Sequence, residues 1–258
     1  LSEGLNVMRP SMMPTGLESI AYNINRKNAD LLFFEFGKIY AATGVGKYIE
    51  TESLAIYFTG NKNETDWKNK AEKTGIYFAK GICNTIFKLG GANDVGFSNG
   101  TNDFLTDFIM ATINGKPIAE IGSVKKSILE KFSIKQPVFY AYINWQEFLL
   151  STKTKPISFG EIPKFPQVQR DLSLIVDKTI SYQSLEESVK TLKISKLKEY
   201  RLFDIFESEK LGANKKSMAI SFTFSDKEKT LTDEETDAMM NEIINSIEKN
   251  TSAEIRNN

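Results

Sequence analysis

The run Phe165–Asp177, which reads Phe-Pro-Gln-Val-Gln-Arg-Asp-Leu-Ser-Leu-Ile-Val-Asp, constrains the fold of this chain more than any other stretch. Pro163 and Pro166 stand at its start, where proline removes a backbone donor and interrupts regular structure. Apolar and polar side chains then alternate, which is typical of a β-strand with one buried face. We therefore expect a strand here that opens a second domain, and a linker before it over residues 153–163.

Composition excludes several kinds of chemistry. The 258 residues contain no histidine and a single cysteine, Cys83, which excludes Ser-His-Asp and Cys-His catalysis and any disulfide within the chain. We expect Cys83 to pack as a small apolar side chain, and we expect no metal site. The 33 basic residues balance 33 acidic ones, so an RNA contact must come from a local cluster. No apolar run reaches the roughly 20 residues that cross a membrane.

Residues 1–152 predict an antiparallel sheet with a few helices. Apolar runs indicate strands at 31–40, 53–59, 108–113, 117–121 and 137–145. We expect Leu31–Tyr40 to be a buried central strand because the run is nearly continuous and rich in aromatic residues. Asn114-Gly115 predicts a two-residue hairpin. Helical spacing indicates helices after Thr15, which we expect to be the N-cap, over 78–86 and near 125–132.

Residues 164–258 predict two helices on one face of a four-stranded sheet. Alternation in 172–176 and 217–224 indicates strands, and apolar spacing in 185–192 and 239–247 indicates helices. Thr232-Asp-Glu-Glu235 is a capping box at the start of the second helix. The order βαββαβ is that of the ferredoxin-like fold, so the whole chain is predicted to be α+β.

Several separated motifs, in the same order along the chain, resemble one protein family. They are Val7-Met-Arg-Pro-Ser-Met-Met-Pro14, Leu32-Phe-Phe-Glu-Phe-Gly-Lys-Ile-Tyr40, the run from Phe165, Arg201-Leu-Phe-Asp-Ile-Phe206 and Thr230-Leu-Thr-Asp-Glu-Glu235. Together they resemble the β subunit of bacterial phenylalanyl-tRNA synthetase. The resemblance spans nearly the whole chain and is to the C-terminal part of that subunit, a synthetase-like core followed by a ferredoxin-fold anticodon-binding domain. The chain starts without a methionine, and we expect it to be a fragment.

The resemblance implies a cytoplasmic class II ligase that joins phenylalanine to tRNA with ATP and magnesium. In this family an α2β2 assembly forms, catalysis belongs to the α subunit, and the β core serves as its non-catalytic partner. Active class II enzymes follow the strand that resembles Phe34–Tyr40 with an arginine that contacts ATP. Ala41-Ala42-Thr43 stands there instead. We therefore expect this chain to be catalytically inert and to hold no cofactor of its own.

Six residues of the second domain are candidates for tRNA binding. If Phe203 and Ile205 point to the helices, Leu202, Asp204 and Phe206 point to the open face, where Phe206 can stack on a base. Basic side chains that can meet phosphates are Arg170, Lys198, Arg201, Lys215 and Lys216. The alternatives are that Phe206 packs against another part of the protein and that the cations are a solvated surface.

Two other readings of function stay open from the sequence. One is a regulatory module that binds an amino acid, although the strand-to-helix turn Asp177–Ser181 carries no glycine for such a ligand. The other is a purely structural relative of an enzyme with no RNA contact. Arg9 is expected either to pair with a carboxylate or to contact a partner, and Phe33, Phe34 and Phe36 are expected in the core or in a subunit interface.

Overall fold

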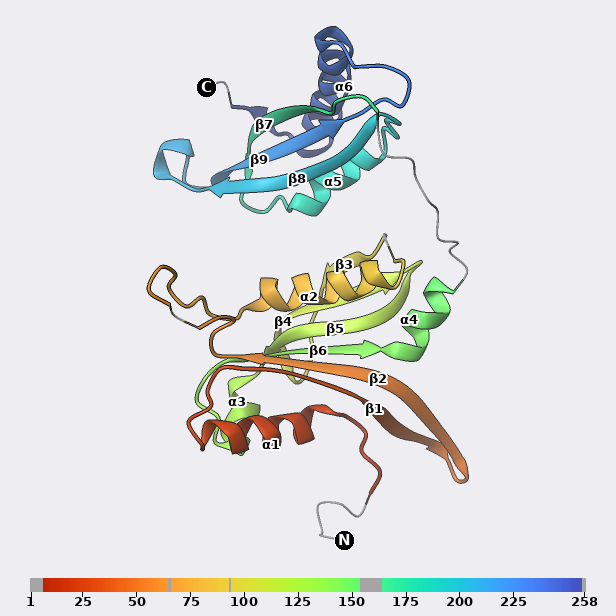
Figure 1. The fold of residues 1–258 in the computed structure, drawn as a ribbon, viewed down its shortest axis with the longest axis vertical. Coiled ribbons are helices and arrows are strands. Elements are labelled where there is room, and N and C mark those ends of the chain that lie inside the picture. The colour runs from red at the N-terminus through yellow and green to blue at the C-terminus, as the bar shows by residue number, and fades with distance from the viewer. Residues whose placement is uncertain (1–6, 65, 93, 154–163, 257–258) are drawn as a thin grey trace. The chain divides into compact units, whose positions relative to one another are not determined.

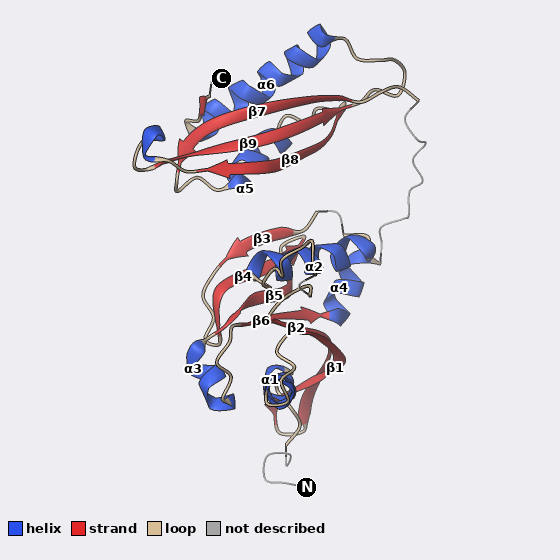
Figure 2. Ribbon diagram, turned by 60° about the vertical axis from the view of Figure 1, so that its left-hand side comes forward, coloured by secondary structure: helices blue, strands red, loops and turns tan. Residues whose placement is uncertain are grey.

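The computed structural model describes residues 7–64, 66–92, 94–153 and 164–256. The chain divides into two compact units, Leu1–Ser158 and Phe159–Asn258, called here the N-terminal unit and the C-terminal unit. Both combine antiparallel sheets with helices (Figure 1, Figure 2), which confirms the predicted α+β class. Nearly all of the linker predicted over 153–163 lies outside the described residues.

The N-terminal unit is built on a six-stranded antiparallel sheet with the order β1-β2-β6-β5-β4-β3. Its strands are β1 (Leu31–Gly44), β2 (Lys47–Thr59), β3 (Gly96–Asn99), β4 (Leu105–Ile113), β5 (Lys116–Val124) and β6 (Val138–Asn144). Its helices are α1 (Met13–Ile24), α2 (Ile76–Leu89), α3 (Lys126–Leu129) and α4 (Trp145–Thr152), and a 3-10 turn spans Glu130–Phe132.

Each face of this sheet carries its own hydrophobic core. Alternation along β2 sends Leu54 and Ile56 to the face covered by α2 and α4, and sends Ala55 and Tyr57 to the face covered by α1 and α3. A strand that is buried on both faces reads as a continuous apolar run, which explains why β2 was easy to predict. The predicted hairpin at Asn114-Gly115 is confirmed, with φ of 51° and 76° at the two turn residues.

Two predictions for the N-terminal unit are wrong. β1 is the edge strand of the sheet, not a buried central one, and its side chains Phe34 and Phe36 are exposed. An apolar run does not distinguish a core from an uncovered surface, which is the cause of the error. Thr15 is not an N-cap: α1 begins earlier, with Pro14 in its first turn, and the Thr15 hydroxyl donates to the Met12 carbonyl at 3.0 Å.

The C-terminal unit has the predicted order βαββαβ. Its strands are β7 (Val168–Asp177), β8 (Leu197–Phe206), β9 (Lys215–Phe224) and β10 (Glu254–Ile255), arranged β10-β7-β9-β8. Its helices are α5 (Tyr182–Lys190) and α6 (Asp233–Thr251), with a 3-10 turn at Glu209–Leu211. Both helices pack on the same face of the sheet (Figure 2). The Thr232 hydroxyl and the Glu235 carboxylate form the predicted capping box at the start of α6.

Pairing of β8 with β9 contains two irregularities that the sequence did not reveal. The register shifts between Leu197 and Glu199 and again between Leu202 and Asp204. Each shift adds one residue to β8, which reverses the side to which the following side chains point. Leu202 lies opposite Ile220 and packs in the core under the helices. The expectation that Leu202 points to the open face is therefore wrong.

Within the described ranges, every helix is too short or too polar to cross a lipid bilayer.

Candidate nucleic-acid interface

The face of the C-terminal sheet that is turned away from α5 and α6, called here the helix-free face, carries the predicted site residues Phe206 and Arg201. Phe206 lies opposite Ser217, and Arg201 lies opposite Ser221. Residues directly opposite each other in an antiparallel pair share a face. Ser217 and Ser221 alternate along β9 with the residues that build the core under the helices. Phe206 and Arg201 therefore both point to the helix-free face.

Small polar side chains occupy the centre of the helix-free face, and larger ones flank them. Ser217 and Ser221 are buried between their neighbours. The Gln169 amide donates to the Ser221 hydroxyl at 2.6 Å. Phe206, in contrast, keeps 47% of its surface exposed, and among the described residues no acid lies within ion-pair distance of Arg201. An exposed ring and an uncompensated guanidinium are the groups that stack on bases and bind phosphates.

Arg170 and Lys216 are engaged elsewhere. The Arg170 guanidinium reaches α6, where it lies 2.5 Å from the Asp233 carboxylate and 3.5 Å from that of Asp237. The hydrogen bond to Asp233 raises the pKa of Arg170. Lys216 donates to the backbone carbonyl of Lys178 at 2.9 Å. The structure thus places Arg170 at the contact between β7 and α6, away from Arg201 and Phe206.

The other two predicted lysines lie at opposite ends of the β8–β9 pair. Lys198 lies in the first irregularity of β8, and its ammonium donates to the Ser195 carbonyl at 2.8 Å. Lys215 starts β9, two residues before Ser217, and its ammonium lies 2.6 Å from the Glu254 carboxylate of β10. That hydrogen bond raises the pKa of Lys215. The structure therefore brings Lys198 near Arg201, and Lys215 near Phe206, instead of gathering all cations in one patch.

Arg9 in the N-terminal unit has a structural partner. Its guanidinium lies 2.8 Å from the Glu35 carboxylate and donates to the Lys38 carbonyl at 3.0 Å. A β-carbon at Gly37 would overlap this guanidinium. The Arg9 carbonyl also accepts a hydrogen bond from the Tyr40 amide at 3.0 Å. Arg9 thus fastens the N-terminal segment to β1, which agrees with the structural alternative.

The β1–β2 hairpin, where an active synthetase would place its ATP-contacting arginine, carries alanines directly after Tyr40. Ala41 lies opposite Ile49, and Ala42 lies opposite Tyr48. All four of these side chains are exposed. Alanine and isoleucine offer no charge to a triphosphate.

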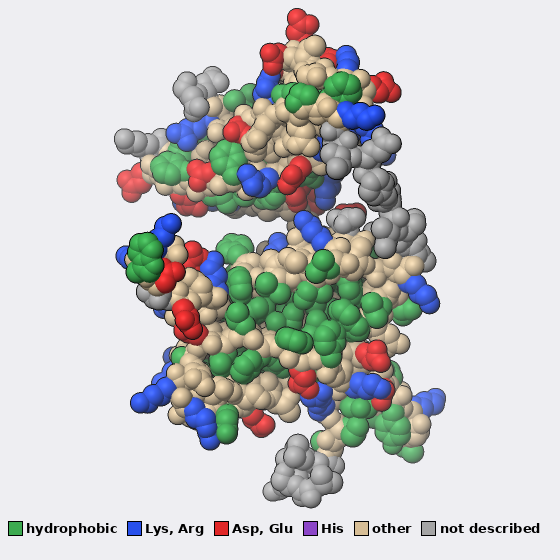
Figure 3. Space-filling view, viewed as in Figure 1, with side chains coloured by type: hydrophobic (Ala, Val, Ile, Leu, Met, Phe, Trp, Pro, Cys, Tyr) green, Lys and Arg blue, Asp and Glu red, His purple; other side chains and the backbone are tan. Residues whose placement is uncertain are grey.

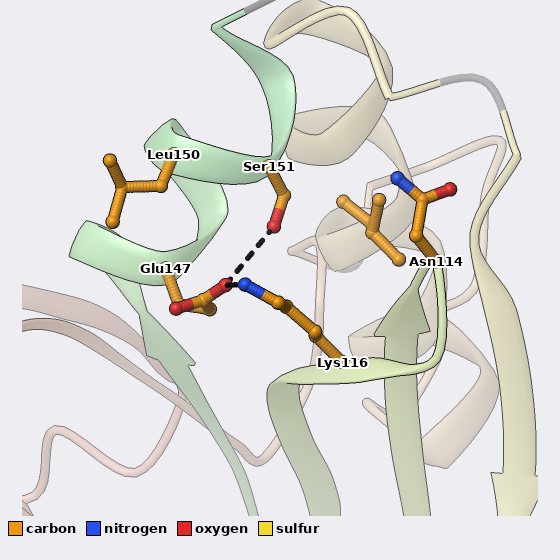
Figure 4. A pocket seen from close by; sticks show the side chains of 6 residues that line it. Asn114, Lys116, Glu147, Leu150 and Ser151 are labelled. Atoms are coloured by element: carbon orange, nitrogen blue, oxygen red, sulfur yellow. Dashed lines mark hydrogen bonds and ion pairs between the residues drawn. The ribbon is translucent and has the colours of Figure 1, made fainter.

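A small pocket of about 210 Å³ lies between α4 and the β4–β5 turn (Figure 4). Its polar groups satisfy one another, since the Lys116 ammonium lies 3.1 Å from the Glu147 carboxylate and the Ser151 hydroxyl donates to that carboxylate at 3.5 Å. Ile113, Asn114 and Leu150 complete the lining. The pocket therefore offers little to an incoming ligand. In the described part of the chain, no three acidic or cysteine side chains converge as metal ligands would.

Two known protein families match this chain, one over each unit. Residues 1–145 match the family described as the phenylalanyl tRNA synthetase beta chain CLM domain. The chain belongs to the phenylalanyl-tRNA synthetase beta chain family. Residues 163–256 match the ferredoxin-fold anticodon binding domain. The family predicted from the motifs is thereby confirmed, and so is the class II synthetase-like and ferredoxin-fold architecture.

Curated relatives in the phenylalanyl-tRNA synthetase beta chain family align over almost the entire chain. The phenylalanine–tRNA ligase beta subunit of Bacteroides thetaiotaomicron is 37% identical over 267 residues, which covers 99% of this chain and 33% of that protein. The corresponding subunit of Listeria innocua is 33% identical and that of Porphyromonas gingivalis 30% identical, each across 99% of this chain. The chain spans about a third of the length of these relatives.

Sequence reasoning missed Gln169 as a part of the helix-free face of this beta chain. The alternation in 217–224 places Ser217 and Ser221 on one face, but it does not show that a glutamine from β7 bonds to Ser221. The two shifts in β8 carry no glycine or proline that would mark them. Only the pairing with β9 shows that Asp204 and Phe206 share a face with Arg201.

Proposed function

We propose that the C-terminal unit binds the anticodon-stem region of tRNA through its helix-free face. The observation that carries this proposal is the exposure of Arg201 and Phe206 together on that face, beside the hydroxyls of Ser217 and Ser221. The family description of residues 163–256 as an anticodon binding domain supports it. In this proposal Phe206 stacks on an unpaired base and Arg201 binds phosphate.

Lys198 and Lys215 extend the proposed RNA surface at its two ends. Lys198 is exposed and Lys215 is half-buried, and both carry their ammonium groups on flexible side chains, so each can exchange its present partner for a phosphate. Lys216 lies opposite Val176, on the side of the helices, and is therefore not assigned to this surface. Arg170 contributes mainly by fastening α6 to the sheet, because its guanidinium already meets two carboxylates.

The N-terminal unit, in the same proposal, is a non-catalytic scaffold for a synthetase α subunit. The exposed apolar side chains Leu149 and Leu150 on α4 and Leu89 at the end of α2 support a protein-binding role. The alanines that follow Tyr40 support catalytic inertness, because they cannot hold a triphosphate. We place the functional division at residues 1–152 and 164–258, with the linker between them.

The complete protein, as we propose it, is the β subunit of an α2β2 phenylalanine–tRNA ligase of the cytoplasm. The α subunit would supply the active site, with ATP and magnesium as its cofactors. The beta-chain family and the names of the curated relatives support this assignment. It describes the assembled enzyme, of which this chain is one part.

Replacing Phe206 tests the RNA surface. Phe206→Ala in the 258-residue chain is expected to weaken tRNA binding by about 1–3 kcal/mol, because a stacked aromatic ring is removed. Fluorescence anisotropy with labelled tRNA that accepts phenylalanine measures this affinity.

Ile205→Ala is the matched control for that substitution. Ile205 is the preceding residue, has a similar exposure of 51% against 47% for Phe206, and lies opposite Met218 on the face of the helices. Its replacement should leave tRNA affinity within about twofold of the starting value, a difference of about 0.4 kcal/mol. Equal losses in the two variants would show that the helix-free face has no special role, and the proposal would then fail.

A further inference from the structure

Trp67, in the loop that joins β2 to α2, is almost fully exposed. It keeps 95% of its surface accessible. Tryptophan is the largest side chain and is highly buried in most proteins. Figure 1 shows this loop projecting from the N-terminal unit, and Figure 3 shows hydrophobic, basic and acidic side chains at its end. An uncovered indole ring on a projecting loop is a candidate contact for another molecule.

Hydrogen bonds at two levels hold this loop in a defined shape. At its base the Lys62 amide donates to the Glu72 carbonyl at 2.8 Å. At its end the Asp66 carboxylate accepts hydrogen bonds from the Lys68 amide at 2.7 Å and from the Asn69 amide at 2.6 Å. These bonds fix the backbone on both sides of the tryptophan. Binding through its ring therefore costs less conformational entropy than binding through a disordered segment.

Two lysines close to Trp67 have no acidic partner. Lys68 follows the tryptophan directly, and Lys70 lies two residues beyond Lys68. Both side chains are exposed. Among the described residues, no acid lies within ion-pair distance of either ammonium group. Three residues of extended chain span at most about 11 Å, so the ring and both ammonium groups start close enough together to meet one short stretch of a ligand.

Acids of the same loop leave a small surplus of positive charge. Residues 62–73 contain four lysines and three acids. One acid, Glu72, pairs with Lys62 at the base of the loop. The Asp66 carboxylate is bound by the Asn69 side chain and by backbone amides, and these hydrogen bonds lower its pKa. The third acid, Glu64, precedes this turn.

This combination of groups favours RNA over a protein or a membrane as the partner. Tryptophan is enriched in protein interfaces, but lysine is depleted there. A segment that binds a membrane surface needs a larger apolar face than one ring. Aromatic rings with cations beside them are the groups by which proteins bind single-stranded nucleic acid.

We propose that residues 66–70 form a second RNA contact, in which Trp67 stacks on an unpaired base and Lys68 and Lys70 bind the phosphates beside it. This contact belongs to the N-terminal unit and shares no residue with the helix-free face. The choice of tRNA as its ligand rests on the function proposed above. The contact itself requires only an unpaired base with its neighbouring phosphates.

Tryptophan fluorescence of the 258-residue chain tests this contact directly. Stacking on a base quenches indole emission, and Trp67 and Trp145 are the two tryptophans of the chain. Phenylalanine-accepting tRNA and a short single-stranded RNA should each quench this emission in a saturable way. Trp67→Phe should abolish the quenching. An RNA duplex should bind at least about fivefold more weakly by this signal, because it offers no unpaired base.

Salt dependence of the same signal tests the two lysines. Lys68→Ala combined with Lys70→Ala should reduce the slope of log affinity against log salt by about 1.4, since each phosphate on a single strand contributes about 0.7. Lys88→Ala, which removes an exposed lysine from the last turn of α2, is the control and should leave the slope unchanged.

Several results would overturn the inference. They are the absence of quenching by either RNA, quenching that persists in Trp67→Phe, equal quenching by the duplex, and quenching by a synthetase α subunit but not by RNA. Because the signal arises at Trp67, it is separate from the Phe206→Ala test. Unquenched Trp67 with reduced tRNA affinity in Phe206→Ala would overturn this inference and leave the proposed function intact. Quenched Trp67 with unchanged affinity in Phe206→Ala would do the opposite.

Discussion

At the scale of single residues, Gly16 shows how a close contact can override helix propensity. Glycine inside a helix costs about 1 kcal/mol relative to alanine, so the sequence gives no reason for one in α1. The Tyr57 ring passes over this position, and a β-carbon at Gly16 would overlap it. The Tyr57 hydroxyl donates to the Met12 carbonyl at 2.7 Å, and burial raises its pKa. The ring therefore has little freedom to move aside.

Gly16→Ala is expected to lower the free energy of unfolding by about 1–3 kcal/mol, because the added methyl group overpacks the contact with Tyr57. Chemical denaturation followed by circular dichroism measures it. Gly81→Ala is the matched control, since Gly81 is also inside a helix but has open space around the same position. It should raise stability by up to about 1 kcal/mol. Effects of the same sign in both variants would contradict this account.

Which residues form the candidate site was only partly predictable at this scale. Arg170 and Arg201 look alike in the sequence, since each is a basic residue in a predicted strand. Arg170 follows the regular alternation of β7 and points to the helices, where Asp233 meets it. Arg201 points to the helix-free face, and the irregularities on either side of it in β8 cannot be read from residue types. The burial of Cys83 was predictable, because the residue lies on an apolar helix face. Burial raises the pKa of the Cys83 thiol to about 12.

At the scale of elements, helix ends were predictable where the capping residue is explicit. Thr232 and Glu235 form a reciprocal pair that can be recognised in the sequence, and the structure contains both hydrogen bonds. Helix α4 was missed altogether, because Asn144 ends a strand and caps the helix at once, by accepting a hydrogen bond from the Glu147 amide. A residue that serves two elements gives no separate signal for the second one.

Thr232→Ala is expected to destabilise the start of α6 by about 1 kcal/mol, because the helix loses its side-chain cap. Hydrogen exchange at the first amides of α6, above all that of Glu235, should then speed up roughly fivefold to tenfold. Thr230→Ala, two residues earlier, serves as control, since Thr230 is exposed and outside the helix. Unchanged exchange at Glu235 in the Thr232 variant would mean that the cap contributes nothing.

At the scale of the whole molecule, balanced charge means that any cationic surface depends on local arrangement. The 33 basic and 33 acidic side chains cancel. Among the described residues no acid forms an ion pair with Arg201, although Glu199 and Asp204 of β8 share its face. Class and family were predictable at this scale because the motifs are spread along the whole chain. The edge position of β1 was not predictable, because strand order depends on pairing between residues that are far apart in the sequence.

Salt dependence of tRNA binding measures how many cations neutralise phosphates. Lys198→Ala combined with Arg201→Ala should reduce the slope of log affinity against log salt by about 0.7–0.9 for each phosphate that the variant no longer neutralises. Lys249→Ala, which removes an exposed cation from the last turn of α6, should leave the slope unchanged. An identical reduction in both cases would indicate a diffuse charge effect and no defined RNA surface.

The central place of β6 in the N-terminal sheet has a consequence for how the chain is made. β6 is the last strand of that sheet in the sequence, yet it lies between β2 and β5, so that Ser53 pairs with Asn144. During synthesis the β1–β2 and β4–β5 hairpins leave the ribosome first and have no partner to join them. Each must wait with its apolar faces uncovered until residue 144 emerges, which makes this interval the one in which a nascent-chain chaperone matters most.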